Sequence, residues 1–168
     1  MSYTLARTSF CWGTRRGKVS EAYLTQLLAS RLRALGLRVA TNVFALGVEI
    51  DIIALFTGSR PTVSVIEVKR RPKRKLVEQL KRRAQFSDLV FAAVPSRYVA
   101  AALHRIPQCF GVIAVDESIT YVARGSDWFG RGSRLLHALG LQRVYKGWGS
   151  EALSSGNKLY TELSRSIK

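Results

Sequence analysis

Four charged residues in the first half of the chain are spaced so that they could meet at one site. Asp51 lies in the middle of the apolar segment VEIDIIALF, and Glu67 and Lys69 end the segment TVSVIEVK. If these segments are neighbouring strands, Glu67 and Lys69 point to the same face, because alternate side chains of a strand do so. Glu21 falls three residues before Leu24 on a predicted helix, which turns its carboxylate toward the protein.

Carboxylates that converge in this way suit a hard divalent cation. Mg²⁺ takes oxygen ligands, commonly one or two carboxylates with waters and a substrate phosphate, and Mn²⁺ is expected to substitute for it. Asp51 and Glu67 are the two carboxylates that would converge on such an ion. A bound metal lowers the pKa of a water and shields charge on a phosphoryl oxygen. Lys69 would hold the attacking water or stabilise the phosphorane. The residue types therefore suit phosphodiester hydrolysis.

Each of these acids also has a purely structural explanation. Glu21 could favour the positive end of a helix dipole, and Asp51 could be an ion-paired structural acid. Glu67 and Lys69 could be an ordinary pair near a strand end. Glu49 lies on the same strand face as Asp51, so it is a competing ligand and is kept as a supporting residue.

The surrounding segments predict an α/β protein. Leucines at three- and four-residue spacing predict a helix with Ser20 as its N-cap and Gly36 at its end. Strands are predicted at 38–46, 48–56, 62–69, 88–94, 110–115 and 119–123, and further helices at 73–87, 96–105, 135–141 and 158–167. A meander followed by strand–helix–strand units gives a central mixed β-sheet flanked by helices. We expect a core at 1–124 with a basic N-terminal segment, and a C-terminal appendage of unassigned structure at 125–168.

The order of these motifs resembles the PD-(D/E)xK nuclease superfamily, which has the restriction-endonuclease-like fold. The motifs that carry the resemblance lie within residues 14–95 and are RRGKVSE before the first helix, Glu21 on it, Asp51 in EIDIIA and Glu67-Val68-Lys69 in VIEVK. The pattern is most similar to that of archaeal Holliday junction resolvase-like nucleases. The resemblance implies a core of order α-β-β-β-α-β, metal binding by the three acids, assistance to the water by Lys69 and support from Gln79. The chain departs from the family in lacking the proline that often precedes the strand aspartate.

The charge balance points to a polyanionic partner. The net charge is +16, from 27 Lys plus Arg against 11 Asp plus Glu. We expect duplex or branched DNA rather than a membrane, because a long run of cations begins at the candidate site. The predicted DNA-binding residues are Arg15, Arg16, Lys18, Arg70, Arg71, Lys73, Arg74, Lys75, Lys81, Arg82 and Arg83. Phosphate contacts of this kind position a substrate without reading its sequence, and no base-reading element is evident, which argues against a sequence-specific restriction enzyme.

The predicted function is a metal-dependent endodeoxyribonuclease that is structure-selective, in the manner of a Holliday junction resolvase. Such an enzyme would be a homodimer, because two symmetric nicks need two sites. A RecB-like exonuclease and a non-catalytic nucleic-acid-binding module on the same fold stay open as alternatives, and RNA stays open as a substrate. The two cysteines and two histidines lack zinc-ligand spacing, and no signal peptide or membrane span is recognisable. We therefore expect a soluble cytoplasmic protein.

Overall fold

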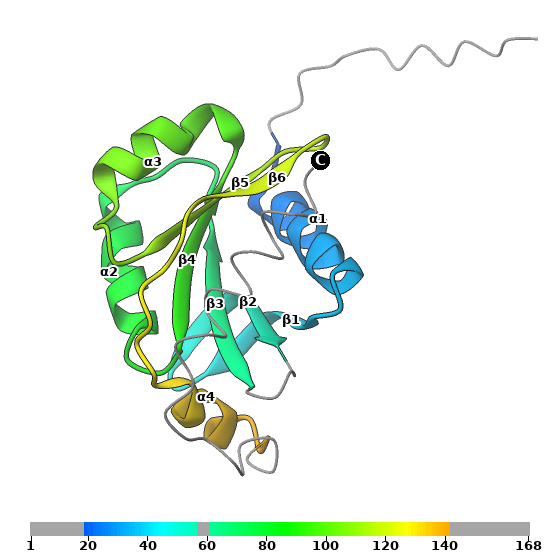
Figure 1. Cartoon of the computed structure of the whole chain (residues 1–168), viewed down its shortest axis with the longest axis vertical. Helices are drawn as coiled ribbons and strands as arrows, with labels where there is room; N and C mark the ends of the chain where they lie inside the picture. The colour runs from blue at the N-terminus through cyan, green and yellow to red at the C-terminus, as the bar shows by residue number, and fades with distance from the viewer. Residues whose placement is uncertain (1–18, 57–60, 142–168) are drawn as a thin grey trace, which may run out of the picture.

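A six-stranded mixed sheet forms the centre of the protein (Figure 1). The computed structural model describes residues 19–56 and 61–141. The strands follow one another across the sheet in chain order as β1 (Arg38–Ala45), β2 (Val48–Phe56), β3 (Thr62–Val68), β4 (Leu89–Val94), β5 (Gly111–Val115) and β6 (Thr120–Arg124). The strands β3, β4 and β5 are parallel, whereas β1, β2 and β6 extend the sheet by antiparallel pairing. The predicted mixed sheet flanked by helices is confirmed.

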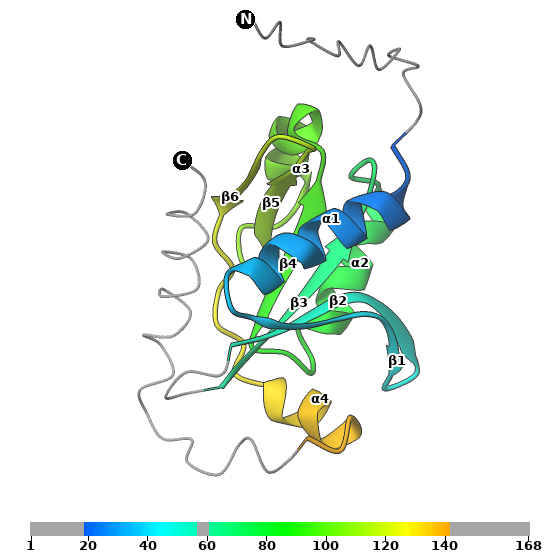
Figure 2. The same cartoon turned by 90° about the vertical axis from the view of Figure 1, so that its right-hand side faces the viewer.

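Helices cover both faces of this sheet (Figures 1 and 2). They are α1 (Glu21–Ala34), α2 (Arg74–Arg83), the 3₁₀ turn η1 (Ser96–Tyr98), α3 (Val99–Arg105) and α4 (Gly132–Ala138). The apolar side of α1 packs on one face, while α2 and α3 pack on the other. Every residue of β3, β4 and β5 is buried, as expected for parallel strands with helices on both sides. In the described residues no helix combines the length and the apolar character needed to cross a membrane.

The first helix begins and ends where its sequence signals predict. The side chain of Ser20 caps it by accepting a hydrogen bond from the Tyr23 backbone N–H, 3.0 Å away. Gly36 follows the helix with φ of 84°, a conformation that favours glycine. Arg31 fixes the helix to the turn between β5 and β6 by donating to the carbonyl oxygens of Asp116 and Ile119. These contacts hold Glu21, the first residue of α1, at one end of the sheet.

Three predicted helices differ from those in the structure. The predicted helix 135–141 begins and ends three residues earlier, as α4 (Gly132–Ala138). The predicted helix 73–87 ends earlier, at Arg83, because the following residues turn to bring Asp88 into the core. The predicted helix 96–105 starts as the 3₁₀ turn η1, in which Tyr98 N–H bonds to the Pro95 carbonyl at 2.8 Å. The predicted helix 158–167 and most of the turn at 57–61 lie outside the described residues.

The described part of the predicted appendage is continuous with the core. Leu135 and Leu136 of α4 are buried against β2 and β3. Asp88, which is fully buried, ties this segment down: its Oδ1 accepts from Gly132 N–H at 2.8 Å and its Oδ2 accepts from Val63 N–H at 2.9 Å. The carboxylate therefore joins α4 to the start of β3.

This role of Asp88 predicts a large effect on stability. Replacing Asp88 by Ala removes the acceptor for two buried N–H groups, so we expect the free energy of unfolding to fall by about 2–4 kcal/mol. Urea unfolding followed by circular dichroism measures it. Asp127→Ala removes an exposed acid from the same region and should change stability by less than about 0.5 kcal/mol. Equal unfolding midpoints for the two variants would contradict this role.

Candidate active site

The site lies where β2 and β3 separate. Their antiparallel pairing runs from Phe56 opposite Thr62 to Ile52 opposite Ile66 and stops there. One step further along, the Val68 backbone N–H donates to the Asp51 carboxylate (Oδ2) at 2.8 Å. On its other side β3 stays joined to β4, because Lys69 N–H donates to the Ala93 carbonyl at 2.9 Å. The Asp51 carboxylate thus accepts a backbone hydrogen bond from β3 at the point where the pairing of β2 with β3 ends.

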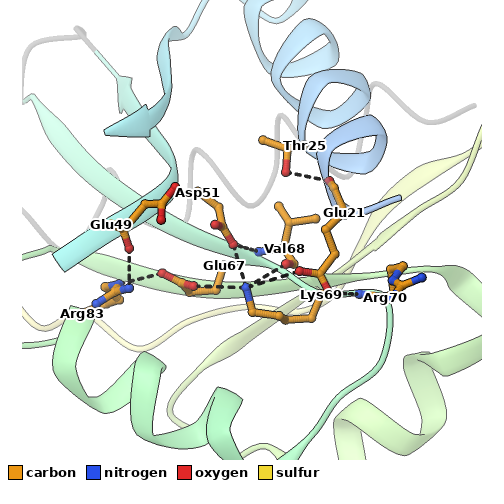
Figure 3. A network of polar contacts seen from close by, with 9 residues as sticks. All are labelled: Glu21, Thr25, Glu49, Asp51, Glu67, Val68, Lys69, Arg70 and Arg83. Carbon is orange, nitrogen blue, oxygen red and sulfur yellow. Dashed lines mark hydrogen bonds and ion pairs between the residues drawn. The ribbon is translucent and has the colours of Figure 1, made fainter. Parts of the chain in front are cut away.

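The ammonium group of Lys69 lies at the centre of the cluster (Figure 3). Its Nζ is 3.0 Å from Asp51 Oδ2 and 3.0 Å from the Val68 carbonyl oxygen. It is also 3.6 Å from Glu67 Oε2 and 4.0 Å from Glu21 Oε2. The four residues predicted to form a catalytic set are therefore brought together from α1, β2 and the end of β3.

Glu67 is the deeply buried member of this set. Its side chain is 1% exposed, and its Oε1 accepts from the Arg83 Nε at 2.6 Å. Arg83 is itself buried and also donates to the Glu49 carbonyl oxygen at 2.6 Å. The prediction that Arg83 binds DNA is wrong, because its guanidinium group is buried inside the protein and paired with Glu67. Helical spacing could have revealed this, since Arg83 follows Leu76 and Leu80 on the buried side of α2.

Glu21 is the most accessible of the three carboxylates. Its side chain is 47% exposed, and its Oε1 accepts from the Arg70 backbone N–H at 3.2 Å. The position of this carboxylate depends on α1 lying across the end of β3, which the Ser20 cap and the Arg31 contacts secure. Glu21 therefore faces both the buried cluster and solvent.

The two supporting residues lie in different places. Glu49 has an exposed side chain, and within the described residues no hydrogen bond or ion pair joins its carboxylate to Lys69. Gln79 of α2 lines the cavity beside the cluster. The structure thus brings Asp51, and not Glu49, into contact with the ammonium group.

The charges in the cluster shift one another's pKa values. Burial and the nearby Asp51 carboxylate raise the pKa of Glu67, and the cations of Arg83 and Lys69 offset only part of that rise. Burial lowers the pKa of Lys69, but the carboxylates of Asp51, Glu67 and Glu21 raise it by more, so the net shift is upward. Lys69 is therefore a cation at neutral pH, and in this arrangement it acts as a positive charge and not as a base.

The atoms around this ammonium group are chemically suited to a hard metal ion. Mg²⁺ is bound by carboxylate and carbonyl oxygens and needs only one or two protein carboxylates. Arg83 binds Glu67 Oε1, and both Val68 N–H and Lys69 bind Asp51 Oδ2, so the remaining oxygens are Asp51 Oδ1 and Glu67 Oε2, the latter 3.6 Å from Lys69 Nζ. Over residues 19–56 and 61–141, however, no three His, Cys, Asp or Glu side chains form a ready-made metal-binding group. A metal would have to replace the Lys69 ammonium among these oxygens.

The predicted DNA-binding residues divide between several environments. Arg70, Arg71, Lys73 and Lys75 line a cavity of about 440 Å³ that Lys69 and Glu21 also line. Arg74 and Arg82 are exposed elsewhere on α2, and Lys81 pairs with Glu78 at 3.0 Å. The predicted contacts Arg15, Arg16 and Lys18 lie outside the described residues. The cavity also has Arg97 in its wall, which the sequence analysis missed because Arg97 is far from the long run of cations.

Comparison with known proteins supports the fold alone. No protein-family model matches the chain, and no curated protein matches it. Among solved structures, the chain is similar to the SPO1766 protein of unknown function from Silicibacter pomeroyi, with a TM-score of 0.55 and 20% sequence identity. The similarity covers 71% of this chain and 83% of that chain. At this identity the likeness concerns the α/β architecture and carries no functional assignment.

The ion pair between Glu67 and Arg83 generates a test of the buried cluster. Arg83→Ala leaves the Glu67 carboxylate buried without its closest cation, so we expect a loss of about 3–5 kcal/mol in the free energy of unfolding. Arg82→Ala removes the same charge from an exposed position on the same helix and should cost less than about 0.5 kcal/mol. Chemical denaturation measures the free energy of unfolding of both variants. Similar small losses of this free energy in the two variants would mean that Arg83 is solvated.

Proposed function

We propose that this protein is a metal-dependent nuclease that hydrolyses phosphodiester bonds in nucleic acid. The observation that carries the proposal is the meeting of Asp51, Glu67, Glu21 and Lys69 at the edge of a cavity lined with cations. The carboxylates attract cations, whereas the lysine and arginine side chains attract anions. A metal ion bound to a polyanion suits both groups. A nucleic-acid strand with a bound Mg²⁺ satisfies this requirement.

Each residue has a role that follows from its position. Asp51 and Glu67 would hold the metal, and Glu21, which is more exposed, would complete its surroundings through water. When bound, the metal lowers the pKa of a coordinated water and neutralises charge on the phosphate. Lys69, once displaced from the carboxylates, stays protonated and can stabilise the negative charge that develops on the phosphoryl oxygens. Arg83 keeps Glu67 fixed and takes no part in binding substrate.

The resemblance to the PD-(D/E)xK superfamily is consistent with this proposal. The chain has the element order α-β-β-β-α-β that the resemblance implies, and the acids stand on the first helix, the second strand and the third strand. A structure-selective endonuclease like a junction resolvase and a RecB-like exonuclease would use the same residues. Branched and linear DNA substrates separate these two enzymes, and sedimentation tests the homodimer that a resolvase needs.

One observation favours a second candidate, a non-catalytic nucleic-acid-binding module. With three carboxylates against Lys69 and Arg83, the cluster keeps one net negative charge, and each buried acid already has a cation. Such a cluster is stable without a metal. This module would bind DNA equally well in a chelator and would cleave no substrate.

Cleavage by purified protein tests the proposal. We expect Mg²⁺- or Mn²⁺-dependent cleavage of at least one substrate among single-stranded, duplex, flap and four-way-junction DNA and RNA of matched sequence. Asp51→Asn and Glu67→Gln keep the side-chain shapes but remove the charges, and each should lower the rate by about 100-fold or more. Glu78→Gln makes the same acid-to-amide change at an exposed position on α2 and serves as a control with near-normal activity. Full activity in both acid variants would refute the proposed site.

Metal binding can be measured without catalysis. A ligand present at about 100 times its Kd stabilises the folded state by about 2.7 kcal/mol, so saturating Mg²⁺ or Mn²⁺ should raise the melting temperature of the wild-type protein. The same metal should leave the melting temperature of Asp51→Asn almost unchanged, because one of the two principal ligands is lost. Differential scanning fluorimetry with a Ca²⁺ comparison provides the measurement. Identical shifts in both proteins would place any metal elsewhere.

A further inference from the structure

Of the ten described residues that line the cavity beside the carboxylates, six are cations. It is lined by Lys69, Arg70, Arg71, Lys73, Lys75 and Arg97, together with Val19, Glu21, Leu76 and Gln79. Its volume is about 440 Å³, within the range of about 300–1,000 Å³ that encloses a small ligand. Lys69 and Glu21 belong both to this wall and to the carboxylate cluster, so the cavity opens directly onto the candidate active site.

The positive charge of this cavity is not neutralised from within the described protein. Apart from Lys69, the cationic side chains of the wall make no ion pair with a carboxylate in the part of the chain that the structure describes. Among the described residues of the wall, Glu21 is the only acid, and it contacts Lys69 and the backbone of Arg70. Several like charges around a small space repel one another, so the cavity is suited to an anion with more than one negative charge.

Two of these cations are held in place before any ligand arrives. The guanidinium carbon of Arg97 lies 5.1 Å from the centroid of the Tyr98 ring, and that of Arg71 lies 5.8 Å from the same centroid. Arg105 of α3 donates to the Pro72 carbonyl, which fixes the loop that follows β3. Arg71 and Arg97 come from the carboxyl ends of the parallel neighbours β3 and β4, where open α/β sheets bind their ligands.

From these observations we infer that the cavity binds the terminal phosphate of a nucleic-acid strand. The inference rests on the proposed nuclease function and specifies its substrate as a phosphorylated strand end. A terminal phosphate monoester carries about −1.5 to −2 charges at neutral pH and three acceptor oxygens, whereas an internal phosphodiester carries a single charge. A cavity of about 440 Å³ has the size of a small-ligand site, so it can enclose a strand end but not a double helix.

Binding without metal tests this inference independently of cleavage. The probes are one fluorescent oligonucleotide with a 5′-phosphate, with a 3′-phosphate or with hydroxyls at both ends, measured by anisotropy in EDTA. We expect one phosphorylated end to bind about tenfold more tightly than the hydroxyl end, a ratio typical of one lost charge-assisted contact. Arg97→Ala should abolish this ratio, and Arg97→Lys should restore part of it.

Arg82→Ala is the matched control, since it removes one exposed Arg outside the cavity. It should weaken all three probes alike and keep their ratio. Equal binding of the three probes, or a preference that Arg97→Ala leaves intact, would overturn the inference. If that preference holds but no metal supports cleavage, the proposed nuclease function fails and the phosphate pocket stands. If metal-dependent cleavage occurs without any end preference, the nuclease function stands and the phosphate pocket is overturned.

Discussion

Burying the carboxylate of Glu67 at the end of an apolar strand would be costly if no cation neutralised it. The protein supplies two cations, Arg83 from α2 and Lys69 from the end of the same strand. The first ties α2 to the sheet and reaches the backbone of β2 through the Glu49 carbonyl. The second gathers Asp51 and Glu21 around its ammonium group. The arrangement of helix, strands and site therefore depends on how this one buried charge is balanced.

The position of the site depends on a change in strand pairing. On one side β3 is antiparallel to β2, and this pairing stops at Ile66; on the other side β3 is parallel to β4 and stays joined to it as far as Lys69. The end of the β2 pairing leaves the Val68 backbone N–H for Asp51 to bind. The parallel pairing of β3 with β4 places the loops that follow these two strands next to each other. The carboxylates and the cationic cavity share this edge for the same reason.

The run of cations from Lys69 to Arg83 shows that burial changes the role of a charged side chain. Arg71 and Lys73 face the cavity, Arg82 faces solvent, and Arg83 neutralises an acid in the core. A similar point applies to Asp88, which the sequence presents only as an acid before an apolar strand. Folding surrounds it with backbone N–H groups of distant residues, so it has a structural role.

The sequence by itself determined the α/β class and the order of the elements, and it indicated four candidate residues for one site. These follow from local rules, since alternation, helical spacing, capping and turn residues act over a few positions. Only the tertiary structure decided that Lys69 lies among the carboxylates, that Glu49 does not, that Arg83 is buried and that Arg97 joins the cavity. Those outcomes depend on where strands separate and on which loops become neighbours, and contacts between residues far apart in the chain leave no periodic signal in the sequence.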